Sequence, residues 1–183
     1  MANLMGLSGS LRKGSFNTAL IRAAAGMVPG GSQLTVHTLH GIPLYDGDVE
    51  ATSGVPQIVV ELKDAVAACD GLLLATPEYN NSIPGVFKNA IDWMSRPSAD
   101  IKRVFGGKPV AVMGASPGPF GTLLSQTAWL PVLRTLGTKP WFGGRLMVSR
   151  AGSVFDANGA ITDEKVREQL KAFVEGFVTF CGS

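Results

Sequence analysis

The chain has 183 residues, close to the usual length of one domain, so we expect a single domain over residues 1–183. Hydrophobic residues make up 45% of the chain and charged residues only 16%, which excludes a disordered protein. The 16 lysines and arginines against 14 aspartates and glutamates give a formal charge of +2 without charge runs, so neither nucleic acid nor an anionic membrane is an expected partner.

The apolar runs, the cysteines and the histidines indicate where the protein is located and whether it binds a metal. Runs such as Gly71–Thr76 stop well short of the ~20 residues that a membrane helix needs, and no secretory signal pattern opens the chain. We therefore expect a cytoplasmic protein without membrane insertion. Cys69 and Cys181 are too few for a disulfide scaffold, and His37 and His40 have no cysteine or carboxylate placed to complete a site, so no metal is expected.

Short β-type runs alternate with longer segments of helical period, which is typical of βα units that wind a parallel sheet with helices on both faces. The middle strands suit burial on both faces, because they are rich in Val, Leu and Ile or lie between helices. The order of the strands cannot be read from this pattern. The predicted strands are Asn3–Leu7, Gln33–Thr38, Gly71–Ala75, Val110–Gly114 and Arg145–Val148.

Two helices are predicted in the middle of the chain. The first has an apolar stripe that ends at Cys69, which makes this cysteine a core residue rather than a reactive one. The second has Ser82 as a candidate N-cap, Pro84 at its start and Pro97 just beyond its end. His40–Pro56 is the longest irregular stretch, and loops of that length are often functional.

Two further helices are predicted in the C-terminal part. Thr122–Leu136 has helical period, although Pro131 inside it should kink or restart the helix. The last helix follows a candidate N-cap at Thr162 and is expected to serve packing. Its apolar stripe consists of Val166, Leu170, Phe173, Val174 and Phe177.

The connection after the first strand, Ser8–Thr18, is rich in phosphate-binding chemistry. Ligands of open α/β sheets lie beyond the carboxyl ends of the strands, where a helix N-terminus offers free N–H groups. Gly14 is not followed by the lysine of a nucleotide triphosphatase loop, and the glycine spacing does not match the dinucleotide fingerprint, so a monophosphate fits better. The alternative is a serine-rich turn that only caps the first helix. The polar side chains are Ser8, Ser10, Arg12, Lys13, Ser15, Asn17 and Thr18.

The connections after the third and fourth strands belong to the same edge. Thr76–Gly85 has two prolines that stiffen a backbone suited to hold N–H and C=O groups against a flat ring, provided that strands one and three are neighbours. In Ala115–Gly121, Ser116 and the backbone of Gly118 are candidates for one edge of that ring, with Phe120 packing nearby. Plain turns with helix caps are the alternative for both connections.

The quoted segments resemble the NADPH-dependent FMN reductase family of flavodoxin-like proteins, in particular its quinone, chromate and azo reductase branch. Gly9–Asn17 is similar to the flavin phosphate loop of that family, and Ile42–Asp46 is similar to its long loop near the subunit interface. Pro77–Asn80 with Pro84 and Lys88–Trp93 resembles its flavin-ring loop and the helix that follows.

The resemblance implies an α/β, three-layer flavodoxin-like fold with a five-stranded parallel sheet of order 2-1-3-4-5 and helices on both faces. It implies bound FMN, NADPH or NADH as co-substrate, a small-molecule electron acceptor, and a homodimer or homotetramer. Arg96 and Arg103 are weaker candidates for steering an anionic acceptor or the NADPH phosphate, with solvated surface charge as the alternative. The implied FMN-binding residues are Ser10, Leu11, Arg12, Ser15, Phe16, Asn17, Thr18, Pro77, Glu78, Tyr79, Asn80, Ser82, Ser116 and Gly118.

The expected function is therefore two-electron transfer from NAD(P)H through FMN to quinones, or to other acceptors such as chromate, azo or nitro compounds, in a ping-pong cycle. No catalytic side chain is expected, because the flavin carries the chemistry. The alternatives are a flavodoxin-type electron carrier, which the slightly basic charge disfavours, and a flavin-binding module that responds to redox state. The preferred nicotinamide dinucleotide and the physiological acceptor are not readable from the sequence.

Overall fold

A computed structural model describes residues 1–182 and contains a sheet in which every strand pair is parallel. The order β2-β1-β3-β4-β5 confirms the expected order 2-1-3-4-5, and β6 pairs with β4 beyond the end of β5. All strands therefore run in the same direction, and all except β5, which pairs only with the start of β4, end at the same edge of the sheet. They are β1 (Asn3–Ser8), β2 (Gln33–Thr38), β3 (Gly71–Ala75), β4 (Pro109–Ala115), β5 (Lys139–Pro140) and β6 (Leu146–Val148).

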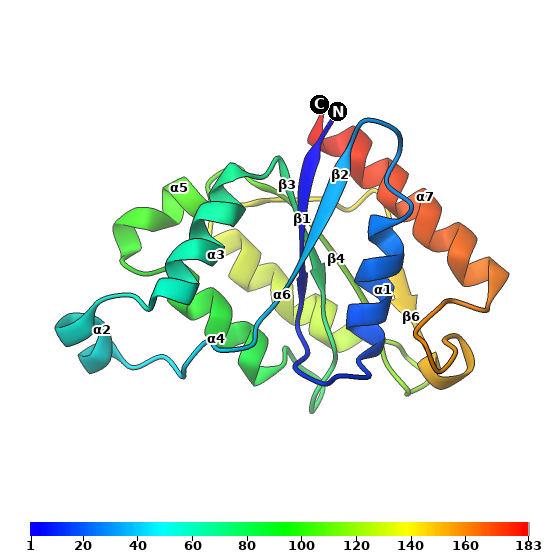
Figure 1. The fold of residues 1–183 in the computed structure, drawn as a ribbon, viewed down its shortest axis with the longest axis horizontal. Coiled ribbons are helices and arrows are strands. Elements are labelled where there is room, and N and C mark those ends of the chain that lie inside the picture. The colour runs from blue at the N-terminus through cyan, green and yellow to red at the C-terminus, as the bar shows by residue number, and fades with distance from the viewer. Residues whose placement is uncertain (183) are drawn as a thin grey trace.

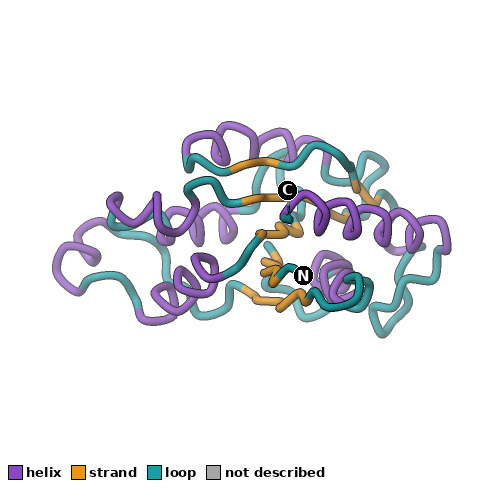
Figure 2. The backbone as a smooth tube through the Cα atoms, turned by 90° about the horizontal axis from the view of Figure 1, so that it is seen from above, coloured by secondary structure: helices purple, strands orange, loops and turns teal. Residues whose placement is uncertain are grey.

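Helices cover both faces of the sheet, with α1 and α7 on one side and α3 to α6 on the other (Figures 1 and 2). The short helix α2 projects from the end of the molecule at the left of Figure 1. Within residues 1–182, no helix combines the length and the apolar character that a bilayer crossing requires. The helices are α1 (Phe16–Ala25), α2 (Gly47–Ser53), α3 (Gln57–Ala68), α4 (Gly85–Met94), α5 (Ile101–Phe105), α6 (Leu123–Thr135) and α7 (Glu164–Cys181).

The sheet separates two apolar cores, because successive side chains of a strand point to opposite faces. In β3, Leu73 packs toward α1 and α7, whereas Leu72 and Leu74 pack toward the helices of the other face. Cys69 is buried in the second core and Cys181 is half-buried at the end of α7. Burial raises the pKa of both thiols, that of Cys181 to about 12, which fits the expectation that they act as small hydrophobes.

The last part of the sheet differs from the predicted single strand Arg145–Val148. Two short strands, β5 and β6, pair in turn with β4, and the chain leaves the sheet between them. The cause is the indole of Trp141, which packs edge-on against Phe173 of α7. A Cβ on Gly143 would lie 2.5 Å from this ring, and a Cβ on Gly144 would lie 2.6 Å from it. The chain can therefore pass the ring only because both residues are glycines.

The stretch His40–Pro56, predicted as irregular, contains α2. The Asp46 carboxylate caps this helix by accepting a hydrogen bond of 2.9 Å from the N–H of Asp48. None of the residues of α2 is buried, so no apolar period in the sequence could reveal the helix. The five-residue α5 was not predicted either, because two buried residues, Val104 and Phe105, are too few to show a period.

Two predicted helix caps are wrong by one or two residues. Pro84 rather than Ser82 precedes α4, because the two main-chain groups of Ser82 already pair with Tyr79. Asp163 rather than Thr162 caps α7, and the Thr162 hydroxyl donates instead to the Val154 carbonyl. The predicted helix around Pro131 is confirmed as α6, which continues through Pro131 without the restart that was one of the two expected effects. Thr122 is at its N-cap position but forms no side-chain cap bond.

Candidate functional site

Three loops meet at the carboxyl edge of the sheet, at the bottom of Figure 1, and enclose a small hollow of ≈ 50 Å³. They follow β1, β3 and β4, which are neighbours in the sheet. The structure thus brings together nine of the predicted site residues, while Leu11, Thr18, Asn80, Ser82 and Gly118 lie in the same loops or the adjoining helix without lining the hollow. The nine are Ser10, Arg12, Ser15, Phe16, Asn17, Pro77, Glu78, Tyr79 and Ser116.

The loop after β1 forms a cradle of buried hydroxyl groups. Ser10 and Ser15 are only 3% and 7% exposed, although both side chains are polar. The Ser10 Oγ accepts a long bond of 3.3 Å from the N–H of Arg12, and the Ser15 Oγ caps α1 by accepting from the N–H of Thr18. The first turn of α1 still presents N–H groups that have no intrahelical acceptor, and such groups attract an anion.

Asn17 lines the hollow and also has a structural role that was not predicted. Its Nδ2 donates to the carbonyl of Ala115 over 2.8 Å, and its Oδ1 accepts from the N–H of the same residue over 2.9 Å. The side chain is 4% exposed. Asn17 therefore acts as a two-bond clamp that fixes the N-terminus of α1 to the end of β4, and the N-terminal turn of α1 is held in place by it.

The cradle depends on a close approach at Gly9. Its N–H donates to the Ala75 carbonyl over 2.9 Å, which keeps the loop beside the end of β3. A Cβ at this position would lie 2.1 Å from a ring carbon of Phe87 in α4. Only glycine therefore allows the first loop to pass between β3 and α4.

The loop after β3 has a tight turn at Tyr79–Ser82. The main-chain groups of these two residues are joined by paired hydrogen bonds of 3.2 Å and 3.1 Å. Asn80 and Asn81 lie between them in the left-handed region, with φ of 50° and 62°. Asn tolerates this region better than other residues with a Cβ, so the turn presents the half-exposed Tyr79 ring at a fixed place beside the hollow.

Glu78 links the loop after β3 to α6. Its Oε2 accepts from the N–H groups of Leu124 and Ser125 over 2.8 Å and 3.0 Å. Below it, the hydroxyl of buried Thr76 contacts the Ser125 hydroxyl at 2.9 Å and accepts from the Trp129 indole over 3.1 Å. The carboxylate of Glu78 thus stabilises the positive end of α6 and anchors the loop.

The loop after β4 is fixed by bonds to the segment that follows β6. The Ser116 N–H donates to the Val148 carbonyl over 3.0 Å, and its hydroxyl donates to the Gly121 carbonyl over 2.7 Å. The Gly118 carbonyl accepts from the N–H of Arg150. Both donors of Ser116 are therefore engaged, one with β6 and one within the loop, and the contact predicted between its hydroxyl and a ligand would use the oxygen lone pairs.

The charge of the site is positive at the cradle. Arg12 and Lys13 are exposed, and within residues 1–182 neither forms an ion pair. No carboxylate stands in the segment from 8 to 18. These cations and the end of α1 favour a bound anion, in agreement with a phosphate site.

The two other predicted arginines are engaged away from the cradle. Arg96 pairs with Glu50 at 2.8 Å, and this hydrogen bond lowers the pKa of Glu50 and raises that of Arg96. Arg103, on α5, pairs with Asp64 of α3 and with Asp100 just before α5. Because α5 precedes β4, it lies at the opposite edge of the sheet. The structure does not bring Arg103 to the site.

His40 is a site residue that sequence reasoning missed. Its ring lies between two groups, the Thr38 hydroxyl and the Leu11 carbonyl, each 3.1 Å from one nitrogen. It thereby braces the cradle from the end of β2. The sequence offered only a histidine close to a strand end, and its partner lies 29 residues away in the chain.

The cradle of buried hydroxyls, helix terminus and cations, beside a rigid loop at the point where the strand order reverses, defines the class of flavodoxin-like flavoproteins. The comparisons specify it further: residues 2–153 match the NADPH-dependent FMN reductase family. The chain belongs to this family, and it is an oxidoreductase that works with FMN and a reduced nicotinamide dinucleotide.

Known proteins similar to the chain span nearly its whole length. An NAD(P)H-dependent FMN reductase of Pseudomonas aeruginosa is 45% identical over 168 residues, which are 92% of this chain and 89% of that protein. A 2-hydroxy-1,4-benzoquinone reductase of Burkholderia is 38% identical over 94% of this chain and 92% of its own length. The solved NAD(P)H:acceptor oxidoreductase FerB of Paracoccus denitrificans has a TM-score of 0.86 and 36% identity, and the match covers 100% of this chain and 98% of FerB.

Proposed function

We propose that the protein reduces quinones with electrons from NAD(P)H through bound FMN. The observation that carries the proposal is the phosphate cradle, placed beside a rigid loop that presents an aromatic ring. The side chains of Arg12 and Lys13 in this cradle form no ion pair among residues 1–182. The acceptor class is supported by relatives named as quinone reductases, including the Escherichia coli protein at 36% identity over 92% of either chain. Chromate, azo and nitro compounds are further acceptors we expect, because reduced flavin is a permissive donor.

The residues of the three loops divide the work of holding the cofactor. Ser10, Arg12 and Ser15, with the first N–H groups of α1, would bind the phosphate, and Pro77–Asn80 and Ser116 would line the ring. FMN supplies the chemistry when bound, since it accepts two electrons from a reduced nicotinamide and passes them on. The Glu78 carboxylate is held by two N–H donors, so it positions the loop rather than moving protons.

We place the co-substrate and the acceptor in turn at one open side of the site, which gives a ping-pong cycle. The three loops line the hollow, and the Tyr79 side chain in its lining is half-exposed. Initial rates measured at several fixed quinone concentrations should give parallel double-reciprocal lines against NADPH. Intersecting lines would show that both molecules bind at once and would overturn the shared position.

The test of the function uses the visible spectrum of the purified protein. FMN-loaded protein should bleach on anaerobic addition of NADPH and recover its colour on addition of a quinone. A protein that takes up no FMN would overturn the reading of the cradle. A protein that binds FMN yet reacts with neither NADPH nor NADH would instead be an electron carrier or a redox-responsive module.

We further propose self-association as a homodimer or homotetramer in the cytoplasm. The support is a set of exposed apolar side chains on and beside α6, which we call the α6 patch, since grouped exposed apolar residues often mark protein–protein contacts. A second apolar group, Leu44 with Val49, projects near α2. The α6 patch consists of Phe120, Leu123, Leu124, Leu130 and Phe142.

A further inference from the structure

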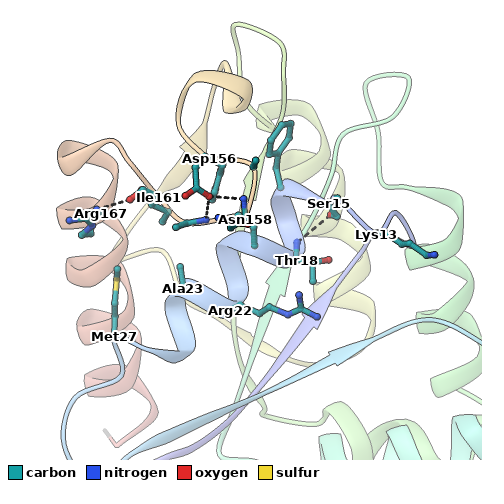
Figure 3. A pocket seen from close by; sticks show the side chains of 17 residues that line it. Lys13, Ser15, Thr18, Arg22, Ala23, Met27, Asp156, Asn158, Ile161 and Arg167 are labelled. Atoms are coloured by element: carbon teal, nitrogen blue, oxygen red, sulfur yellow. Dashed lines mark hydrogen bonds between the residues drawn. The ribbon is translucent and has the colours of Figure 1, made fainter.

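A larger hollow, of ≈ 540 Å³, runs along the outer side of α1 (Figure 3). One of its walls is the segment from 155 to 161 that leads into α7. It shares Ser15 and Phe16 with the site described above, but it extends along the helix as far as Met27. We call it the α1 cleft. Its volume lies within the range of about 300–1,000 Å³ that is typical of small-molecule sites.

The floor of the α1 cleft is apolar. On α1 it includes Ala23, which is small and half-buried, whereas Ala19 is in contact with the turn at Gly159. The Phe16 ring stacks on Phe155, with 5.6 Å between ring centroids and 27° between planes. Such a floor suits the face of a planar ring.

The opposite wall is preformed. The Asp156 Oδ1 accepts hydrogen bonds of 2.9 Å and 2.8 Å from the N–H groups of Asn158 and Ala160, which fixes the turn. Gly159 has a φ of 82°, and a Cβ there would lie 3.2 Å from the Cβ of Ala19, so the turn packs closely on α1. The one carboxylate that lines the cleft is therefore already occupied by two donors.

Cations stand on both sides of the α1 cleft. Figure 3 shows Lys13 and Arg22 on one side of α1 and Arg167 on the other. Arg167 bonds to Glu164 and to the Ile161 carbonyl, whereas Lys13 and Arg22 form no ion pair within the described part of the chain. The side of Lys13 and Arg22 is therefore positive and uncompensated.

We propose that the α1 cleft binds a nucleotide. Its planar base would lie on the apolar floor, and a phosphate would point toward Arg22 and Lys13. Two sources of such a ligand share this chemistry. The first is the adenosine end of the nicotinamide co-substrate, an assignment that rests on the proposed function. The second is a free nucleotide. Ser15 and Phe16 line both the α1 cleft and the proposed flavin site, so the first source would place the co-substrate next to the flavin.

The test is titration of the oxidised, FMN-saturated protein with 2′,5′-ADP, followed by calorimetry. Arg22→Gln should weaken binding about tenfold, the usual effect of losing one charge-assisted contact of ~1.4 kcal/mol. Ala157→Trp, on the exposed wall, should block the cleft without disturbing the core. Arg134→Gln is the matched control, because Arg134 is also an exposed arginine in the last turn of a helix.

The outcomes distinguish failure of the α1 cleft as a nucleotide site from failure of the proposed reductase function. Absence of binding at millimolar probe, equal losses in Arg22→Gln and Arg134→Gln, or binding only to FMN-free protein would overturn the α1 cleft as a site, even where NADPH still bleaches the flavin. If the site holds, a raised KM for NADPH with unchanged KM for quinone in Arg22→Gln identifies the co-substrate as the source. Unchanged KM values identify a free nucleotide.

Discussion

Ser15 performs two tasks with one oxygen atom. Its Oγ caps α1 at the N–H of Thr18, and the same buried group lines the proposed phosphate cradle. A hydroxyl has two lone pairs and one proton, so it accepts from the helix and still donates to a phosphate oxygen. At the residue scale, the stability of α1 and the affinity for FMN are therefore linked.

Ser15→Ala should weaken FMN binding by ~1–3 kcal/mol, because a charged acceptor loses a donor. The measurement is a fluorescence titration of the FMN-free protein with FMN. Asp163→Ala is the control, since it removes the N-cap of α7 and should lower stability alone. Equal FMN affinity in Ser15→Ala and the wild type would show that the cradle does not hold the phosphate.

Asn17→Ala should lower both the free energy of unfolding and the FMN affinity, each by ~1–3 kcal/mol, because it leaves the N–H and C=O of Ala115 buried without partners. Asn89→Ala provides the control: Asn89 also forms two main-chain bonds, to Tyr45 and Pro43, but in an exposed position. It should cost less stability and leave FMN affinity unchanged. Urea unfolding and FMN titration of both variants decide the matter.

The residue chemistry of the cradle was predictable, and the partners of its residues were not. The hydroxyls and cations of Ser8–Thr18 follow from their place after an apolar strand. The clamp of Asn17 on Ala115 spans 98 residues, and no local pattern encodes such a pairing. The same holds for Glu78, whose bonds to α6 appear only once β3 and β4 are neighbours.

At the scale of elements, the rigidity of the loop after β3 comes from its turn more than from its prolines. The pair Tyr79–Ser82 closes the turn, and Asn80 with Asn81 accepts left-handed backbone. Asn81→Ala should cost ~1 kcal/mol of unfolding free energy and displace Tyr79, whereas Asn81→Gly should not. Thermal unfolding and FMN affinity of the two variants check this. A stable Asn81→Ala protein with full affinity would mean that the prolines suffice.

A second element-scale feature is a set of two ion pairs that connect α2 and α3 with the segment from 96 to 100 between α4 and α5. Lys63 is 3% exposed and pairs with Asp100 at 2.7 Å, and Arg96 pairs with Glu50. Hydrogen bonding from Lys63 lowers the pKa of Asp100, as that from Arg96 lowers the pKa of Glu50. Both carboxylates are thus stabilised in their charged form by folding.

Because these pKa values are depressed in the folded protein, their stabilisation is complete above the ordinary carboxyl pKa and is lost as the pH falls below about 4. Asp100→Asn should therefore reduce the urea midpoint at pH 7 and flatten its acid dependence. Glu168→Gln removes an exposed carboxylate that has no ion pair within residues 1–182 and should leave the profile unchanged. Parallel profiles for wild type and Asp100→Asn would contradict the assignment.

At the scale of the whole molecule, the alternation of strands and helices was enough to predict the layers, and the family resemblance supplied the strand order. The divided edge of the sheet could not be predicted. It depends on where the Trp141 ring lies against α7, which is a tertiary contact. Helix α2 was not predicted either, because a helix without buried residues shows no apolar period in the sequence.

Self-association is a prediction about the surface as a whole. Leu130 is 44% exposed in the α6 patch, and Leu130→Glu should shift the protein to a smaller species in sedimentation velocity. Ile58→Glu changes a residue of similar exposure on α3 and should leave the assembly intact. If both variants sediment as the wild type does, the α6 patch is not the contact.

The clamp between Asn17 and Ala115 also sets an order of events during synthesis. Chains emerge from the ribosome N-terminus first, so Ser10 and Ser15 are available long before β4 exists. Until Ala115 has been added, Asn17 has no partner and the N-terminal turn of α1 is not fastened to the sheet. We therefore expect FMN to bind only late in synthesis, after β4 has been added. A chain truncated before β4 should be purified without bound FMN.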